Sequence, residues 1–307
     1  MLQKLTSHQQ NLVKKILALK KSKKAIILCH NYQRPEIYEV ADFIGDSLGL
    51  AQKANQTDAK IIVFCGVHFM AESAKILNPN KKVLIPDIES GCAMSDMIEG
   101  YMLKIWKKDY PGVPIVCYVN STAEVKAESD ICCTSSNAVK ICQSLKSKKI
   151  LFVPDKNLAK YVQKNLPEKE IIAWNGYCPI HHRLDKKYIL QAKKDHPKAE
   201  IIVHPECKPE VIKLADHVCS TSQMVMRAAK DSQAKEFVII TECGMINRLS
   251  KEFPDKKFYT VCNMCFDMKK NTLEKILECL EKETNEIEIP ENVRKKAEKA
   301  LKAMMEV

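Results

Sequence analysis

A chain of 307 residues is long enough to bury a large core, and its 46% hydrophobic content is ordinary for a globular protein. No apolar run approaches the ~18 residues that span a bilayer, and the N-terminal segment lacks the features of a signal peptide, so we expect a cytoplasmic protein with no membrane partner. The net charge of +11 comes mainly from lysines dispersed among glutamates, which argues against nucleic-acid binding but can attract small anions.

The predicted elements begin with an amphipathic helix in residues 1–22 and end with another helix in 286–307. Between these helices, short apolar runs alternate with longer helical patterns, which is typical of parallel sheets covered by helices. The alternation occurs three times, in residues 23–108, 109–197 and 198–285. We therefore predict an α/β protein of three similar units that pack as one body.

Each unit is predicted to contain three strands in the same order. The first strands are expected at 25–32, 114–120 and 200–206. The second strands are expected at 61–69, 150–157 and 237–245. Between first and second strands lies a turn marked by an aspartate, at 41–47, 129–136 and 215–222. The third strand of each unit leads to a cysteine, in VLIPDIESGC, IIAWNGYC and FYTVCNMC.

These three cysteines are the most regular feature of the repeat, because Cys178 follows Cys92 by 86 residues and Cys265 follows Cys178 by 87. Three equivalent thiolates around an axis can hold a metal centre and leave one position open. The set fits a [4Fe–4S] cluster with one iron that no cysteine binds, or a zinc ion with an open position, and thiolates favour the cluster. Cys262 forms a lone CxxC with Cys265 and is expected to be a neighbour. We expect the fourteen cysteines to be buried thiols or metal ligands, not a disulfide framework.

Polar side chains follow the first strands, at the edge where parallel α/β units bind ligands. They are His30, Asn31, Tyr32, Tyr118, Asn120, His204 and Glu206. A hydroxyl also follows the aspartate of each turn by five residues, at Ser47, Ser135 and Thr221. Because each hydroxyl precedes a helical pattern, it is either a helix N-cap or a group that binds a carboxylate or phosphate. The dinucleotide, Walker A, GxSxG and HExxH motifs are absent, and the adjacent His181 and His182 do not have metal-ligand spacing.

Several segments together resemble the quinolinate synthase family, which comprises iron–sulfur enzymes of de novo NAD biosynthesis. They are HNYQRPEIYEVADFIGDSLGLAQ (30–52), VFCGVHFMAESAKIL (63–77), IPDIESGCAMSD (85–96), YVNSTAEVKAESDICCTSSNA (118–138), WNGYCPIHHR (174–183), VHPEC (203–207) and the MKKNTLEKI stretch after Cys265. The resemblance covers essentially the whole chain. It implies three αβα domains about a pseudo-threefold axis, with a three-cysteine [4Fe–4S] cluster at the centre.

The same resemblance implies that iminoaspartate and dihydroxyacetone phosphate condense to quinolinate, with loss of phosphate and two waters and with the open iron as Lewis acid. An L-aspartate oxidase or aspartate dehydrogenase would be the functional partner that supplies iminoaspartate. By position, the cluster ligands are Cys92, Cys178 and Cys265. The substrate-binding positions are His30, Ser47, Tyr118, Asn120, Ser135, His204, Glu206 and Thr221, and the catalytic positions are Tyr32, Glu206 and His30.

One departure concerns the third ligand, where some relatives have CxxCxxC and this chain has only Cys262 and Cys265. The following MKKNT stretch assigns Cys265. Two other functions stay open from the sequence. Another [4Fe–4S]-dependent dehydratase would use the same centre on other substrates, whereas a non-catalytic iron–sulfur carrier would need a fourth protein ligand and no polar residues in threefold register.

Overall fold

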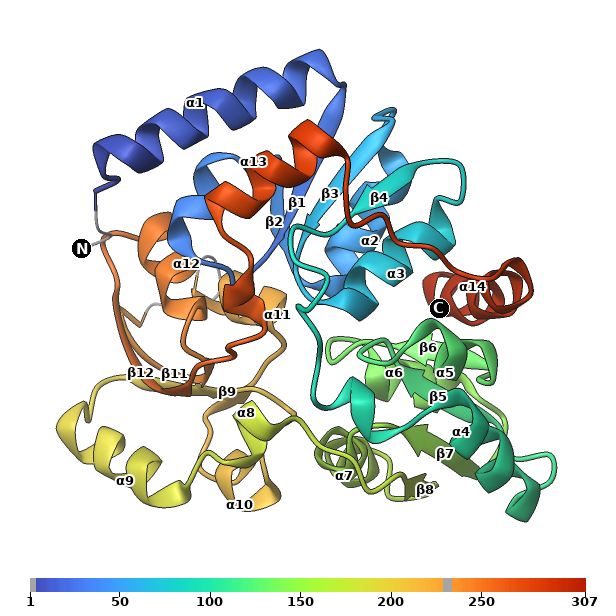
Figure 1. The fold of residues 1–307 in the computed structure, drawn as a ribbon. Helices are drawn as coiled ribbons and strands as arrows, with labels where there is room; N and C mark the ends of the chain where they lie inside the picture. The colour runs from blue at the N-terminus through green and yellow to red at the C-terminus, as the bar shows by residue number, and fades with distance from the viewer. Residues whose placement is uncertain (1–3, 229–233) are drawn as a thin grey trace.

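The computed structural model describes residues 4–228 and 234–307, in which three four-stranded parallel sheets lie around a common centre (Figure 1). The first sheet, in the order β2-β1-β3-β4, contains β1 (Ala25–His30), β2 (Phe43–Gly45), β3 (Ile61–Cys65) and β4 (Lys82–Leu84). The second, β6-β5-β7-β8, contains β5 (Ile115–Tyr118), β6 (Ile131–Cys133), β7 (Lys149–Val153) and β8 (Glu170–Ala173). The third, β10-β9-β11-β12, contains β9 (Glu200–Val203), β10 (His217–Val218), β11 (Glu236–Glu242) and β12 (Lys257–Asn263).

Helices cover the sheets, so the central strands are buried on both faces and consist almost entirely of apolar residues. The helices are α1 (Ser7–Ser22), α2 (Ser47–Gln56), α3 (His68–Leu77), α4 (Gly100–Trp106), α5 (Ala123–Ala127), α6 (Ala138–Ser144), α7 (Lys156–Asn165), α8 (Pro179–His182), α9 (Lys186–Asp195), α10 (Pro209–Ile212), α11 (Thr221–Met226), α12 (Met245–Glu252), α13 (Leu273–Lys282) and α14 (Glu291–Met305). Short 3₁₀ turns include η1 (Pro35–Glu39), η2 (Ser95–Met97), η3 (Lys107–Asp109) and η5 (Met268–Lys270).

The predicted α/β class with three similar parallel units is confirmed, but each unit has one more strand than the sequence suggested. The aspartate-marked turns lead into the short edge strands β2, β6 and β10. The aspartates hold these edges, because Asp42, Asp130 and Asp216 each accept the backbone N–H of an isoleucine in the neighbouring first strand at 2.8 Å. The isoleucines are Ile27, Ile115 and Ile201. The aspartates of these turns therefore have a structural role, which is to hold each edge strand against the first strand of its unit.

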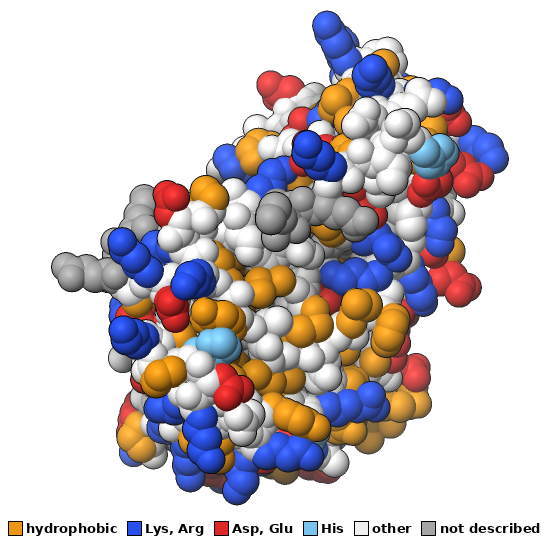
Figure 2. Space-filling model, turned by 90° about the vertical axis from the view of Figure 1, so that its left-hand side faces the viewer, with side chains coloured by type: hydrophobic (Ala, Val, Ile, Leu, Met, Phe, Trp, Pro, Cys, Tyr) orange, Lys and Arg blue, Asp and Glu red, His pale blue; other side chains and the backbone are white. Residues whose placement is uncertain are grey.

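The predicted terminal helices are present and pack on different units. Thr6 caps α1 with a capping box, and α1 lies alongside α13 over the first sheet (Figure 1). The last helix, α14, packs against α5 and β6 of the second unit. On the face shown in Figure 2, basic side chains are dispersed among acidic and uncharged ones, as expected from lysines dispersed among glutamates in the sequence. No helix in the described ranges is both long and apolar enough to cross a membrane.

The expectation that the cysteines would be free thiols or ligands is wrong for one pair. Cys243 and Cys262 form a disulfide with a Cα–Cα distance of 5.1 Å. Cys262 belongs to β12, Cys243 directly follows β11, and these strands are paired, so the fold brings the two residues within the normal disulfide range. The disulfide occupies the sulfur of Cys262, and the choice of Cys265 as the third ligand stays a prediction.

Candidate active site

A central cavity with an empty volume of about 1020 Å³, part of it open to solvent, lies between the three units. All twelve residues that the sequence indicated as ligand, binding or catalytic positions line it. They are His30, Tyr32, Ser47, Cys92, Tyr118, Asn120, Ser135, Cys178, His204, Glu206, Thr221 and Cys265. The fold thus gathers at one place residues that are spread over most of the chain, because each lies at or beyond the carboxyl end of a strand that points toward the centre.

The three cysteines are half-buried, and each precedes a short helical turn: η2, α8 or η5. Burial raises the pKa of the Cys92 thiol to about 12 and that of Cys265 to about 11, and it raises the pKa of Cys178 well above its ordinary value. A backbone N–H three residues after each cysteine opposes this rise. Without a bound cation, the three groups are therefore protonated thiols at neutral pH.

The three hydroxyl residues do not cap their helices. Asp46 caps α2 by accepting the N–H of Gly49 at 2.8 Å, and Ser220 caps α11 in a capping box with Gln223. Ser47 and Thr221 are the first residues of those helices, and Ser135 lies in the turn before α6. None of the three hydroxyls is therefore used for a cap. The Thr221 hydroxyl accepts a hydrogen bond from the side-chain amide of Asn31 at 2.8 Å, which leaves its own proton to be donated to a further partner.

His30 and His204 occupy equivalent places in units one and three. The Nδ1 atom of His30 accepts the N–H of Tyr32 at 3.2 Å, and Nδ1 of His204 accepts the N–H of Glu206 at 3.3 Å. Burial lowers the pKa of each imidazole to about 3, and the neighbouring His181 adds to the shift at His204. Both rings are therefore neutral, and this bonding places the proton on Nε2, where it can be donated.

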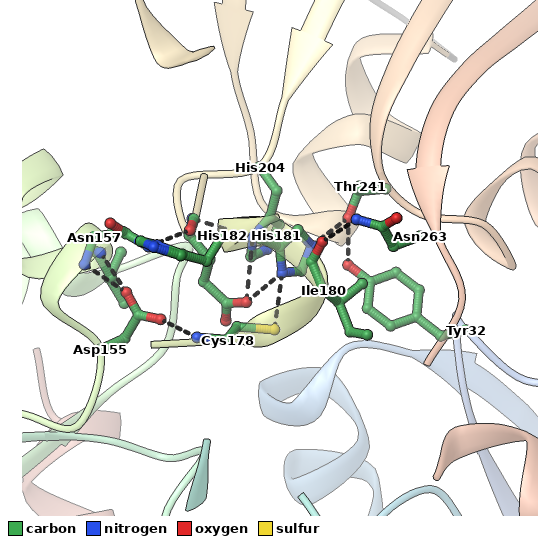
Figure 3. A network of polar contacts seen from close by, with 12 residues as sticks. Tyr32, Asp155, Asn157, Cys178, Ile180, His181, His182, His204, Thr241 and Asn263 are labelled. Carbon is green, nitrogen blue, oxygen red and sulfur yellow. Dashed lines mark hydrogen bonds and ion pairs between the residues drawn. The ribbon is translucent and has the colours of Figure 1, made fainter. Parts of the chain in front are cut away.

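Glu206 is the centre of a buried polar network, and Figure 3 shows His181 and His204 of this network. Its Oε1 accepts the phenol of Tyr118 at 2.6 Å, and its Oε2 lies 2.6 Å from Nδ1 of His181. Burial alone would raise the pKa of this carboxyl, but the imidazole of His181 and the hydrogen bonds from His181 and Tyr118 outweigh it and lower the pKa to about 2. Glu206 is therefore a carboxylate that can accept a proton.

The network continues to Tyr32 through two side chains from the second and third units. Nε2 of His181 lies 2.8 Å from Oγ1 of Thr241, which lies 2.6 Å from the phenol oxygen of Tyr32. Burial raises the pKa of Tyr32 well above its ordinary value, so this phenol keeps its proton. An unbroken chain of hydrogen-bonding groups thus connects an ionised carboxylate with a protonated phenol across the cavity.

Comparison with known proteins assigns this arrangement to a family. The model of the family described as Quinolinate synthetase A protein matches residues 14–306. Curated relatives named quinolinate synthase include one from Alkaliphilus metalliredigens (55% identical, covering 98% of this chain and 99% of the relative) and one from Thermodesulfovibrio yellowstonii (56%, covering 95% and 97%). Another, from Methanosarcina barkeri, is 50% identical and covers 97% of this chain and 98% of its own.

The chain belongs to the quinolinate synthase family. Membership identifies the protein as an enzyme and connects it with NAD biosynthesis. The resemblance seen in the sequence is thereby confirmed over nearly the whole length.

The sequence did not indicate two residues in the site of this quinolinate synthase family member, His181 and Thr241. His181 was set aside because adjacent histidines do not have metal-ligand spacing, yet its place three residues after Cys178 puts its Nδ1 3.2 Å from the cysteine sulfur. Among the described residues, Cys178, His181 and Glu206 are the one group of three possible metal ligands whose ligand atoms all lie within 4.8 Å of one another. The Cys-x-x-His spacing was the available signal. Thr241 had none, because its partners are distant in sequence.

Proposed function

We propose that the protein condenses iminoaspartate with dihydroxyacetone phosphate to give quinolinate, phosphate and two waters, with a [4Fe–4S] cluster held by Cys92, Cys178 and Cys265. The observation that carries the proposal is the convergence of these cysteines, three hydroxyls that do not cap a helix and the Glu206 network on one cavity. The family assignment supports the same reaction. We further propose the cytoplasm as its location and an aspartate oxidase or dehydrogenase as the source of iminoaspartate.

The lining of the cavity suits two small anions. Ser47, Ser135 and Thr221 offer hydroxyls from three units, and the neutral rings of His30 and His204 can donate from Nε2. Asn120 adds a buried Oδ1 atom that accepts no hydrogen bond in the described structure and can accept one from an O–H or N–H group of a substrate. The hydroxyls and the Nε2–H groups are donors, and several of them can hold a dicarboxylate or a phosphate ester.

The donor set fits an iron–sulfur cluster better than a single zinc ion. A zinc ion with Zn–S bonds of about 2.3 Å holds its sulfurs roughly 3.8 Å apart. Among the described residues the three cysteine sulfurs do not form a group within 4.8 Å. More widely spaced thiols suit a larger centre, in which each cysteine binds a different iron. When bound, the cluster supplies Lewis-acid polarisation of a substrate oxygen or nitrogen at the iron that lacks a cysteine.

The protein's own groups supply the proton transfers. Glu206 is ionised and accepts a proton from substrate, whereas Tyr32 is protonated and donates one as a hydroxyl leaves. His181 and Thr241 connect the two and can return the proton from Glu206 to Tyr32 between steps. Tyr118 holds the carboxylate in place through its 2.6 Å bond to Oε1.

The proposal is tested by quinolinate formation from both substrates after anaerobic reconstitution. Wild-type protein should form quinolinate. Glu206→Gln and Tyr32→Phe should retain iron and fold while turnover falls by at least about two orders of magnitude, since each removes a proton carrier. Glu210→Gln and Tyr188→Phe make the same chemical changes at exposed positions and should behave like wild type.

Three outcomes decide between the candidate functions. An iron-loaded wild type that forms no quinolinate from these substrates would favour another dehydratase. Near-normal turnover by both cavity variants would remove Glu206 and Tyr32 from the proton transfers. A protein that isolates with zinc alone would contradict the proposed cluster.

A further inference from the structure

The loop that carries Cys178 is tied to a buried carboxylate in the same unit. Asp155 follows β7 and is fully buried. Its Oδ2 accepts the backbone N–H of Cys178 at 2.9 Å (Figure 3). Its Oδ1 accepts the N–H groups of Asn157 and Leu158 at 2.7 Å each, which caps α7. One carboxylate therefore fixes the end of the strand, the start of a helix and the backbone of a cysteine.

The loop that carries Cys265 has an equivalent bond in the third unit. Glu242 is the last residue of β11 and is 1% exposed. Its Oε1 accepts the N–H of Cys265 at 3.1 Å and lies 3.2 Å from the ammonium of Lys269, while its Oε2 accepts the N–H of Gly244 at 2.6 Å. The carboxylate precedes the cysteine by 23 residues here and also in the second unit. The second and third units thus make the same contact, a carboxylate bonded to the cysteine N–H, with an aspartate in one and a glutamate in the other.

We propose that Asp155 and Glu242 are positioning residues that hold the backbone of Cys178 and Cys265 so that both sulfurs face the cluster site. The inference rests on the proposed cluster for its functional meaning, but the two bonds stand on geometry alone. A buried carboxylate is costly unless N–H groups satisfy it, so both oxygens of each acid restrain the chain around them. Such partners of metal ligands typically change metal affinity by about 10–100-fold when they are replaced.

The first unit uses a different device, which makes Cys92 an internal reference. Ser90, two residues before it, accepts the N–H of His68 through its carbonyl at 2.7 Å. Its hydroxyl lies 2.9 Å from the carbonyl of Gly66 and 2.7 Å from that of Asp267. Among the described residues, no carboxylate accepts the N–H of Cys92. Because Asp267 belongs to the Cys265 loop, the Cys92 loop is an independent reference for the Asp155 variant, which should leave it unchanged.

Amide hydrogen exchange reads the two bonds directly and does not require the cluster. Asp155→Asn replaces Oδ2 or Oδ1 by an NH₂ group that cannot accept, and Glu242→Gln does the same in the third unit. We expect at least about tenfold faster exchange at Cys178 in the first variant and at Cys265 in the second, because each amide loses a hydrogen bond to a charged group, with no change at Cys92 in the first variant. Asp216→Asn is the matched control, because it loses a carboxylate bond to the N–H of Ile201 at 2.8 Å without touching a cysteine.

Cluster retention then connects the bonds with function. In anaerobically reconstituted protein, Asp155→Asn and Glu242→Gln should release iron to a chelator at least about tenfold faster than wild type or Asp216→Asn. If the two variants retain iron as long as the control, or if exchange rises equally at all three cysteines, the inference is wrong. If wild type binds no cluster, the proposed function fails instead, and the exchange pattern still decides the positioning role. Should Asp155→Asn not fold, Glu242→Gln gives the same test in another unit.

Discussion

At the scale of single residues, burial sets the protonation states that the chemistry needs. His30 and His204 are neutral, Tyr32 and Tyr118 keep their protons, and Glu206 is ionised because His181 lies against it. The sequence supplies the groups, but the low polarity around them and their short contacts decide which accept and which donate protons. These shifts also make stability depend on pH.

The pKa of His204 predicts how the cluster-free protein responds to acid. Its pKa is about 3 in the folded chain and 6.5 ordinarily, so the unfolded chain binds a proton first as the pH falls. The stability that the neutral His204 ring contributes is fully present above pH 6.5. Below that pH, the residue should lower the free energy of unfolding by roughly 1 kcal/mol per pH unit. His204→Asn should reduce the slope of unfolding free energy against pH between 6.5 and 5 by that amount.

The His204→Asn variant must be compared with wild type, because Asp155 changes the pH dependence of stability in the opposite direction to His204. Burial and the charge of Glu206 raise the pKa of its carboxyl to about 7, so the folded chain binds that proton first and gains stability as the pH falls toward 4. Asp155 is present in both proteins, and its contribution cancels in the difference. Denaturant titrations at several pH values measure the slopes, and equal slopes for the two proteins would contradict a neutral, buried His204.

At the scale of elements, the starts of α2 and α11 separate capping from ligand binding. The capping groups are Asp46 and Ser220, and the next residues, Ser47 and Thr221, face the cavity. The helix start therefore holds a hydroxyl in a defined place without using it for the helix. The same division of labour appears where Asp155 caps α7 and also binds the Cys178 loop.

A matched pair of serines tests this division. Ser47→Ala should weaken substrate binding by roughly 1–3 kcal/mol with little loss of stability, because a hydrogen bond to an anion is lost and alanine is a good helix former. Ser220→Ala should instead lower stability by about 1 kcal/mol through loss of the cap, with binding near that of wild type. Thermal unfolding and substrate titration measure both. Equal effects of the two changes on binding would refute the separate roles.

At the scale of the whole molecule, the candidate active site belongs to no single unit. Each unit contributes one cysteine and at least one hydroxyl, and the Tyr32 to Glu206 network crosses all three. The last helix joins two units from outside, since α14 packs on α5 and β6 of the second unit and on α3 of the first. A defect in one ligand should therefore affect the centre as a whole.

Removal of single cysteines tests this dependence. Wild-type protein should carry about four irons per chain. Cys92→Ala, Cys178→Ala and Cys265→Ala should each lose most of the iron and the brown colour, whereas Cys262→Ala should keep both because its sulfur is bonded to Cys243. Iron analysis and visible absorption measure the result. Retention by Cys265→Ala together with loss by Cys262→Ala would show that the third ligand was assigned to the wrong cysteine.

The sequence by itself determined the architecture and the residues that line the cavity. A repeat of similar length in all three units is visible in one dimension, so the positions of Cys92, Cys178 and Cys265 and of the three hydroxyls followed from it. The edge strands were missed because strands as short as β10 carry too few residues to show a pattern. The role of the turn aspartates was missed for a related reason, since their partners lie one strand away.

Only the tertiary structure decided which groups act together. Thr241 reaches Tyr32 and His181 across 209 and 60 residues of sequence, and no period relates them. The disulfide between Cys243 and Cys262 and the bond from Glu242 to Cys265 depend on the pairing of β11 with β12, which a single sequence does not state. Charge state likewise depends on burial and on contacts of a few ångströms. The repeat therefore predicted where the chemistry lies, and packing determined how its protons and ligands are held.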